Sequence, residues 1–119
     1  MENFQFDFER LKVYQKVLDL TDLIFDIYKK MNQDYKIAIG SNLIRAILSV
    51  SNNLAEGNDK ESVKERKRYF GISCDSMREC VSVFNVLKRQ NLIDISTYQD
   101  LRFRARGITS MIKGLISGS

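Results

Sequence analysis

The sequence predicts an all-α fold, an antiparallel up-down-up-down four-helix bundle that forms a single domain over residues 1–119. The 119-residue chain contains no proline, and proline interrupts helices and is common in turns. Apolar residues make up 44% of the chain and recur at the spacings of three and four that mark one helix face. They form four segments of roughly 20–28 residues with short polar breaks, which is typical of a bundle.

The first segment covers residues 10–31, and a polar break over residues 32–36 follows it. Its expected apolar face consists of Leu11, Tyr14, Leu18, Phe25 and Tyr28. The second segment covers residues 37–56. Its expected apolar face consists of Leu43, Ile47, Val50 and Leu54. Gly57 predicts the end of this helix, because a glycine after the last turn fits a C′ cap.

The third segment covers residues 62–89 and starts with a capping-box pattern, in which Ser62 precedes Glu65 by three residues. Its apolar face is unusually wide and consists of Tyr69, Phe70, Ile72, Met77, Val81, Phe84 and Leu87. These residues span roughly 160° of the helix, and Val83 and Val86 widen the arc. A face this wide predicts burial against another subunit.

The fourth segment covers residues 96–116 and starts with a second capping-box pattern, from Ser96 to Gln99. Its apolar face consists of Leu101, Ile108, Met111, Ile112 and Leu115. Gly107, Gly114 and Gly118 form a second strip. Because a glycine inside a helix costs about 1 kcal/mol relative to alanine, the strip predicts close approach of a helix or chain, or fraying of the C-terminal end.

The chain contains no histidine, which excludes Ser-His-Asp and Cys-His nucleophiles and most zinc sites. We therefore expect no catalytic residue, cofactor or metal, and hence no enzyme. Cys74 and Cys80 lie six residues apart on the third segment. Six residues rise about 9 Å along a helix, whereas a disulfide needs Cα atoms within about 7 Å. We expect two buried free thiols in a reducing compartment.

The formal net charge of +4 is unevenly distributed, with −1 over residues 1–60 and +5 over residues 61–119. Residues 1–7 are acidic and lack the apolar core of a secretory signal. No run of 18 apolar residues occurs. We therefore expect a cytoplasmic protein with no membrane partner, whose basic half can attract polyanions.

A polar stripe runs along the second segment, where Arg45, Ser49, Asn52 and Glu56 are separated by four, three and four residues. They fall within about 60° of one another on the helix, with Asn53 beside them. The stripe is either a solvated face or a network at a subunit contact or lumen, where Arg45 and Glu56 find charged partners across an interface. Catalysis is disfavoured because no activated nucleophile is present.

Seven basic residues form two further stripes on the third and fourth segments. They are Lys64, Lys67, Arg78 and Arg89 on the third segment and Arg102, Arg106 and Lys113 on the fourth. Because adjacent antiparallel helices would merge the stripes, they predict either ordinary solvated cations or a surface that follows a nucleic-acid backbone without reading bases.

Arg104 lies at the edge of the fourth segment's apolar face and needs a partner, for which Glu79 and Glu56 both fit. The tyrosines and phenylalanines lie mainly at core spacing. Core packing is therefore favoured over a stacking platform for single-stranded nucleic acid.

Three stretches resemble the motifs of one protein family. Residues 8–16 (FERLKVYQK) resemble its opening F-x-D-L-x-V-W/Y-Q, residues 43–57 (LIRAILSVSNNLAEG) its signature L-R-R-A-A-x-S-I-x-S-N-I-A-E-G, and residues 69–79 (YFGISCDSMRE) its F-L-x-I-A-x-G-S-x-x-E. The chain resembles the four-helix-bundle proteins of the large-subunit (23S) rRNA intervening-sequence type. The matching polar and glycine positions are Arg45, Ser49, Asn53, Glu56, Gly57, Ser76 and Glu79. Ile44, Asn52 and Asp75 depart from the pattern.

The resemblance implies a cytoplasmic bacterial bundle protein that assembles as a ring-shaped homopentamer, in which the matching residues serve packing or subunit contacts. It also implies nucleic-acid binding, since a distant relative that acts beside a reverse transcriptase is a basic nucleic-acid-binding pentamer. We therefore expect a non-enzymatic oligomeric accessory protein that binds RNA or DNA through the basic surface of segments three and four. The alternative is a protein-interaction ring that docks onto a larger nucleic-acid enzyme or ribonucleoprotein without binding nucleic acid itself.

Overall fold

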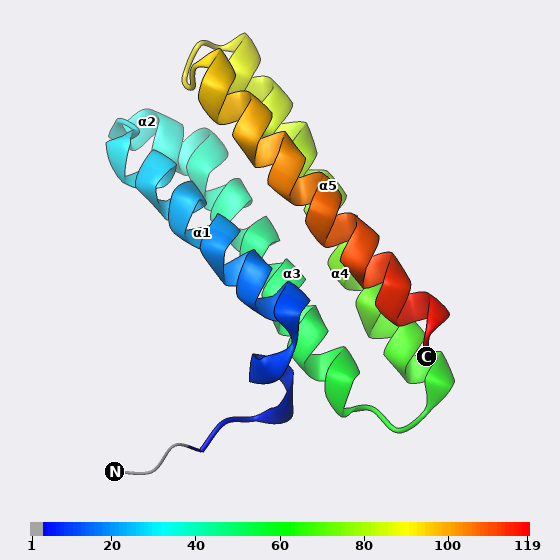
Figure 1. The fold of residues 1–119 in the computed structure, drawn as a ribbon. Helices are drawn as coiled ribbons and strands as arrows, with labels where there is room; N and C mark the ends of the chain where they lie inside the picture. The colour runs from blue at the N-terminus through cyan, green and yellow to red at the C-terminus, as the bar shows by residue number, and fades with distance from the viewer. Residues whose placement is uncertain (1–3) are drawn as a thin grey trace.

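The computed structural model describes residues 4–119 and consists of four long helices in an antiparallel bundle (Figure 1). The long helices are α1 (Lys12–Lys30), α3 (Ser41–Asp59), α4 (Val63–Arg89) and α5 (Ile95–Ser117). Contacts join α1 to α3, α3 to α4, α4 to α5, and α5 back to α1. Each helix therefore packs against two others, which confirms the predicted fold class.

Short helical elements precede α1 and fill the connection to α3. They are η1 (Asp7–Arg10), α2 (Gln33–Tyr35) and η2 (Lys36–Gly40), a single π-helical turn. Asn32 caps α2, because its side-chain oxygen accepts a hydrogen bond of 2.9 Å from the Tyr35 amide. The expected polar break is therefore mostly helical. The expectation that residues 1–7 are not a secretory signal rests partly on residues 1–3, which lie outside the described part of the chain.

The core face of α1 differs from the predicted one. The buried residues of α1 are Val13, Val17, Leu20 and Ile24, while Leu18 is exposed and the other predicted face residues are only partly buried. At 100° per residue, the true face lies about 100° from the predicted one. The prediction followed the large aromatics, whereas smaller β-branched and leucine side chains fill the bundle centre.

The other three helices bury most of their predicted apolar residues. Examples are Leu43 and Leu54 on α3, Phe70 and Phe84 on α4, and Leu101 on α5. The wide apolar face of α4 is largely used within the chain, because α4 packs against α3 on one side and α5 on the other. The width of that face therefore does not itself require another subunit.

Three helix boundaries test the predicted caps. Ser62 caps α4, since its hydroxyl accepts a hydrogen bond of 3.2 Å from the Glu65 amide, as predicted. Helix α5 begins before the predicted Ser96, because Asp94 is the N-cap and accepts from the Thr97 amide at 2.8 Å. Gly57 does not end α3 but lies inside it and is buried.

Both cysteines are free and buried in α4, as predicted. Cys80 is fully buried. Burial raises the pKa of its thiol from 9.0 to about 12, and burial also raises the pKa of Cys74. Both groups therefore stay protonated near neutral pH and are poor nucleophiles.

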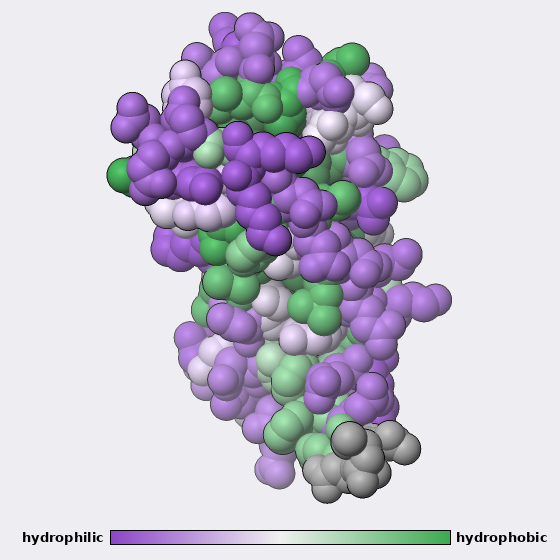
Figure 2. All heavy atoms as spheres, turned by 90° about the vertical axis from the view of Figure 1, so that its left-hand side faces the viewer, coloured by the Kyte–Doolittle hydropathy of each residue, from purple (hydrophilic) through white to green (hydrophobic). Residues whose placement is uncertain are grey.

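The side of the molecule seen in Figure 2 carries hydrophilic side chains with an apolar band between them. Leu18 on α1 and Leu48 on α3 are among the large apolar side chains that stay exposed. Over residues 4–119, no helix combines the length and the apolar character needed to cross a membrane.

Candidate nucleic-acid interface

A groove of about 860 Å³ runs between α4 and α5 on the outside of the bundle. Four of the seven predicted basic residues line it, namely Arg78 from α4 and Arg102, Arg106 and Lys113 from α5. The short connection between α4 and α5 makes the helices antiparallel neighbours, as Figure 1 shows. This arrangement brings the basic stripes of the two helices together, as the sequence predicts.

The groove is electropositive because no acidic side chain offsets its four cations. None of the thirteen lining residues in the described chain is Asp or Glu. Within residues 4–119, the four cations also make no ion pair, whereas three of the other arginines do. Arg45, Arg68 and Arg104 pair with Glu79, Glu65 and Asp100. The groove is thus a place where free positive charge is concentrated.

Asn85 organises one end of the groove. Its side-chain oxygen accepts hydrogen bonds from the Tyr98 hydroxyl at 2.7 Å and from the Arg102 guanidinium at 3.1 Å. The Arg102 guanidinium carbon also lies 5.5 Å from the centroid of the Tyr98 ring. These contacts hold Arg102 in place while leaving it exposed. A positioned guanidinium can donate two hydrogen bonds to one phosphate.

The other three predicted basic residues do not line the groove. Lys64, Lys67 and Arg89 are exposed on α4, and each lies 11 to 14 residues from Arg78. A separation of 11 residues corresponds to about 16 Å along a helix. They share the helix face of Arg78, at the two ends of α4, and can extend a charged track beyond the groove without forming part of it.

Phe103 is the most exposed large apolar side chain among several groove residues that the sequence analysis missed. Its side chain is 78% exposed, and it lines both this groove and a second hollow of about 550 Å³ beside α5. The sequence did contain a signal. Phe103 is about 140–160° around the helix from Leu101, Ala105 and Ile108, which belong to the buried face of α5.

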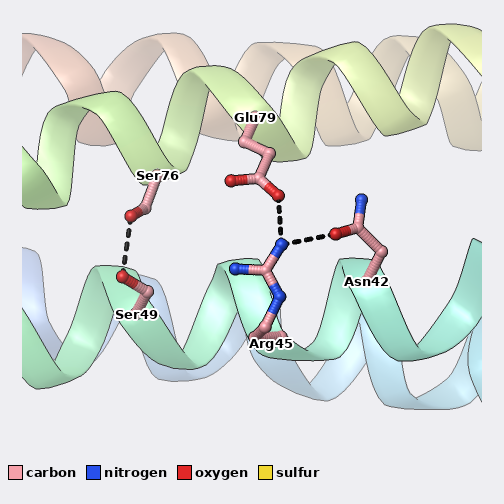
Figure 3. A network of polar contacts seen from close by, with 5 residues as sticks. All are labelled: Asn42, Arg45, Ser49, Ser76 and Glu79. Atoms are coloured by element: carbon pink, nitrogen blue, oxygen red, sulfur yellow. Dashed lines mark hydrogen bonds and ion pairs between the residues drawn. The ribbon is translucent and has the colours of Figure 1, made fainter.

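The family-like polar residues lie elsewhere, at the contact between α3 and α4 (Figure 3). Arg45 pairs with Glu79 at 2.6 Å and also donates to Asn42. The hydroxyl oxygens of Ser49 and Ser76 are 2.7 Å apart. We call this set, together with Asn53 and Gly57, the α3–α4 seam. Its charged partners in the structure come from the same chain, and the interpretation that Arg45 also meets a charged partner across a subunit interface stays a prediction.

The remaining residues of the polar stripe have separate environments. Asn53 donates to the Ser49 carbonyl oxygen at 2.8 Å and to its hydroxyl at 3.1 Å. Asn52 is exposed. Glu56 is exposed and pairs with Lys60, one turn later, at 3.5 Å. The stripe is therefore divided, with one edge in the α3–α4 seam and the other towards solvent.

Gly57 belongs to the α3–α4 seam for a steric reason. A Cβ atom at this position would lie 2.8 Å from two ring carbons of Phe70. Gly107 and Gly114 differ, because an added Cβ would meet nothing within 4 Å. The expected close approach at these two glycines therefore does not occur within the described chain.

Arg104 also corrects the sequence analysis. Neither Glu79 nor Glu56 is its partner. Its guanidinium donates to both carboxylate oxygens of Asp100 at 3.2 Å, one turn earlier on α5. The pair satisfies the charge locally at the surface, so Arg104 makes no link between helices.

Comparison with known proteins places the chain. The family model of the 23S rRNA-intervening sequence proteins matches residues 9–114. A crystal structure of a protein of unknown function from the S23 ribosomal protein family of Bacteroides thetaiotaomicron has a TM-score of 0.81 and 19% identity. That match covers 88% of this chain and 95% of the other. No curated protein matched. The fold and the motif positions agree with the family match, and the chain belongs to the 23S rRNA-intervening sequence protein family.

Proposed function

We propose that this protein is a non-enzymatic accessory protein that binds the phosphate backbone of RNA or DNA in the groove between α4 and α5. The observation that carries the proposal is the set of four cations without a carboxylate partner, Arg78, Arg102, Arg106 and Lys113. Elsewhere in the described chain, several basic side chains are neutralised by Asp or Glu. Uncompensated charge in a groove favours a polyanion.

The polar residues of the groove support contact with phosphate and sugar. Hydroxyl and amide groups of Ser82, Gln99, Thr109 and Ser110 line it beside the cations. Such groups contact phosphate and sugar alongside arginine and lysine in nucleic-acid complexes, and these contacts carry no direct sequence information. We therefore expect binding that depends strongly on salt and weakly on sequence.

We also propose that the protein is a homo-oligomer, as the resemblance implies. The exposed Leu18 and Leu48 and the open surface at Gly107 support this proposal, since a second copy could cover them. An oligomer would repeat the groove and raise the avidity for a long strand. If the protein instead docks only onto another protein, the groove would show no affinity for free nucleic acid.

The test is a charge-neutralised groove compared with an equal loss of charge elsewhere. The groove variant carries Arg78→Gln, Arg106→Gln and Lys113→Gln. The control carries Lys12→Gln, Lys29→Gln and Lys30→Gln on α1, which are also exposed. Both variants have the same net charge, so a difference between them reports position rather than total charge.

Binding is measured by fluorescence anisotropy of labelled RNA and DNA over a range of salt concentrations. The slope of log K against log salt is negative, and we expect the groove variant to make it less steep by about two to three, since each phosphate contact contributes about 0.7–0.9. We expect the control variant to keep the slope of the unchanged protein. Equal behaviour of the two variants, or no binding by the unchanged protein, would overturn the proposal.

A further inference from the structure

Phe103 gives the groove a feature that backbone binding does not need. Its ring is 78% exposed and lies between Arg102 and Arg106 in the sequence. Burial of a phenylalanine side chain stabilises a fold, yet the described chain leaves this ring uncovered. Phe103 lies opposite the buried face of α5, where a polar residue would be expected. Its exposed neighbours Arg102 and Arg106 are polar.

We infer that the groove between α4 and α5 takes single-stranded nucleic acid, with an unpaired base stacked on the ring of Phe103 and the flanking phosphates held by the cations of the groove. The inference rests on the proposed function and deepens it. It predicts a preference that the four cations alone would not produce.

The arrangement of charge and ring supports this inference. Arg102 and Arg106 lie on either side of Phe103 in the sequence, and all three side chains line the same groove. An aromatic ring among cations is the combination used for single strands, in which bases stack while phosphates meet positive charge. In a duplex the bases are already stacked on one another, so an external ring on a helix surface gains no base face.

Phe103 differs from Tyr98, the other aromatic residue of the groove. The Tyr98 ring lies beside the Arg102 guanidinium, and its hydroxyl donates to Asn85. Tyr98 is therefore engaged within the chain, whereas Phe103 forms none of the aromatic or cation–ring pairs found in the described residues. Phe103 also borders the second hollow beside α5, so a base has space on that side of the ring.

The experiment compares a single-stranded RNA, the DNA strand of the same sequence, and the RNA duplex, each labelled and titrated at one salt concentration. We expect both single strands to bind at least tenfold more tightly than the duplex. Phe103→Ala should weaken single-strand binding by about 5- to 150-fold, which is the usual loss for one stacked base. It should leave duplex binding unchanged.

Two further variants keep the test sharp. Phe6→Ala removes another exposed phenylalanine, at 58% exposure, and should change neither affinity. Phe103→Trp keeps a stacking ring and introduces the sole tryptophan, since the chain has none. We expect it to retain binding and its fluorescence to be quenched by single strands but not by the duplex.

The outcomes separate this inference from the proposed function. Equal binding of single strand and duplex, or an unchanged affinity of Phe103→Ala, overturns the stacking inference and leaves backbone binding intact. If the groove charge variant loses salt-dependent binding while Phe103→Ala keeps its full affinity for single strands, backbone binding is supported and the stacking inference is overturned. Failure of the unchanged protein to bind any of the three nucleic acids overturns both.

Discussion

Replacing Gly57 by alanine tests why this chain carries a glycine inside α3. The new Cβ would lie 2.8 Å from both Cδ1 and Cε1 of Phe70 and 3.1 Å from the Cβ of Tyr69. Phe70 is fully buried, so its ring cannot move away without displacing the core. One of α3 and α4 must therefore shift.

The expected magnitude follows from two opposing effects. Overpacking a filled core costs about 1–3 kcal/mol. Alanine returns up to about 1 kcal/mol relative to glycine in a helix, and less at Gly57 because α3 ends two residues later. We expect a net loss of about 1–2 kcal/mol in the free energy of unfolding.

Gly71→Ala is the matched control. Gly71 lies inside α4, and an added Cβ would meet nothing within 4 Å. Only the helix preference acts at this site, so we expect a gain of about 0.5–1 kcal/mol. The same chemical change should therefore have opposite signs at two helical glycines.

The assay is urea unfolding followed by far-ultraviolet circular dichroism, at one protomer concentration because assembly can add to stability. We expect the midpoint to fall for Gly57→Ala and to rise for Gly71→Ala, with similar slopes. A midpoint for Gly57→Ala at or above that of the unchanged protein would refute the reasoning, since it would show that the Phe70 contact imposes no steric limit.

Three further predictions concern α3 and α4. Ser49→Ala should lower the free energy of unfolding by about 1–2 kcal/mol, because the buried Ser76 hydroxyl loses its hydrogen-bond partner. In a double-mutant cycle, Ser49→Ala and Ser76→Ala together should cost less than the sum of the two single changes. Arg45→Gln should cost under about 1 kcal/mol in urea unfolding, since the side chains of Arg45 and Glu79 are 64% and 39% exposed, and a larger loss would contradict that. Burial raises the pKa of Cys80 in the folded state, so the stabilisation from its neutral thiol is complete below about pH 9 and is lost towards pH 12. Over that range the free energy of unfolding should fall by up to about 1.4 kcal/mol per pH unit relative to Cys80→Ala. Parallel curves of unfolding free energy against pH for the two proteins would contradict the effect of burial.

The helical architecture could be predicted from the sequence because it depends on features that repeat over many residues. Four amphipathic segments and the absence of proline sufficed for the bundle. The cap at Ser62 follows from two residues. The core face of α1 could not be chosen by size alone, because Val13, Val17, Leu20 and Ile24 form an equally regular stripe. Only packing against α3 and α5 decides which stripe is buried.

The candidate site was predictable in part. Two basic stripes on consecutive antiparallel helices can meet, and Arg78, Arg102, Arg106 and Lys113 were found in this way. The net positive charge of the groove was not predictable, because it depends on which cations have a carboxylate partner in the folded chain. Arg104 is an exception, because its partner Asp100 lies one turn earlier and such an i, i+4 pair is a local pattern that the sequence already contains.

The two faces of α4 carry separate parts of the molecule. Ser76 and Glu79 face α3 in the α3–α4 seam, whereas Arg78 lies on the opposite side, in the groove with α5. The matching family positions are in or near the seam, and the groove cations are not among them. The seam residues thus hold α3 on α4 through contacts within this chain, while the binding proposal depends on the cations of the groove. Substitutions in the seam should consequently lower stability without changing the salt dependence of binding, and neutralising the groove cations should do the reverse.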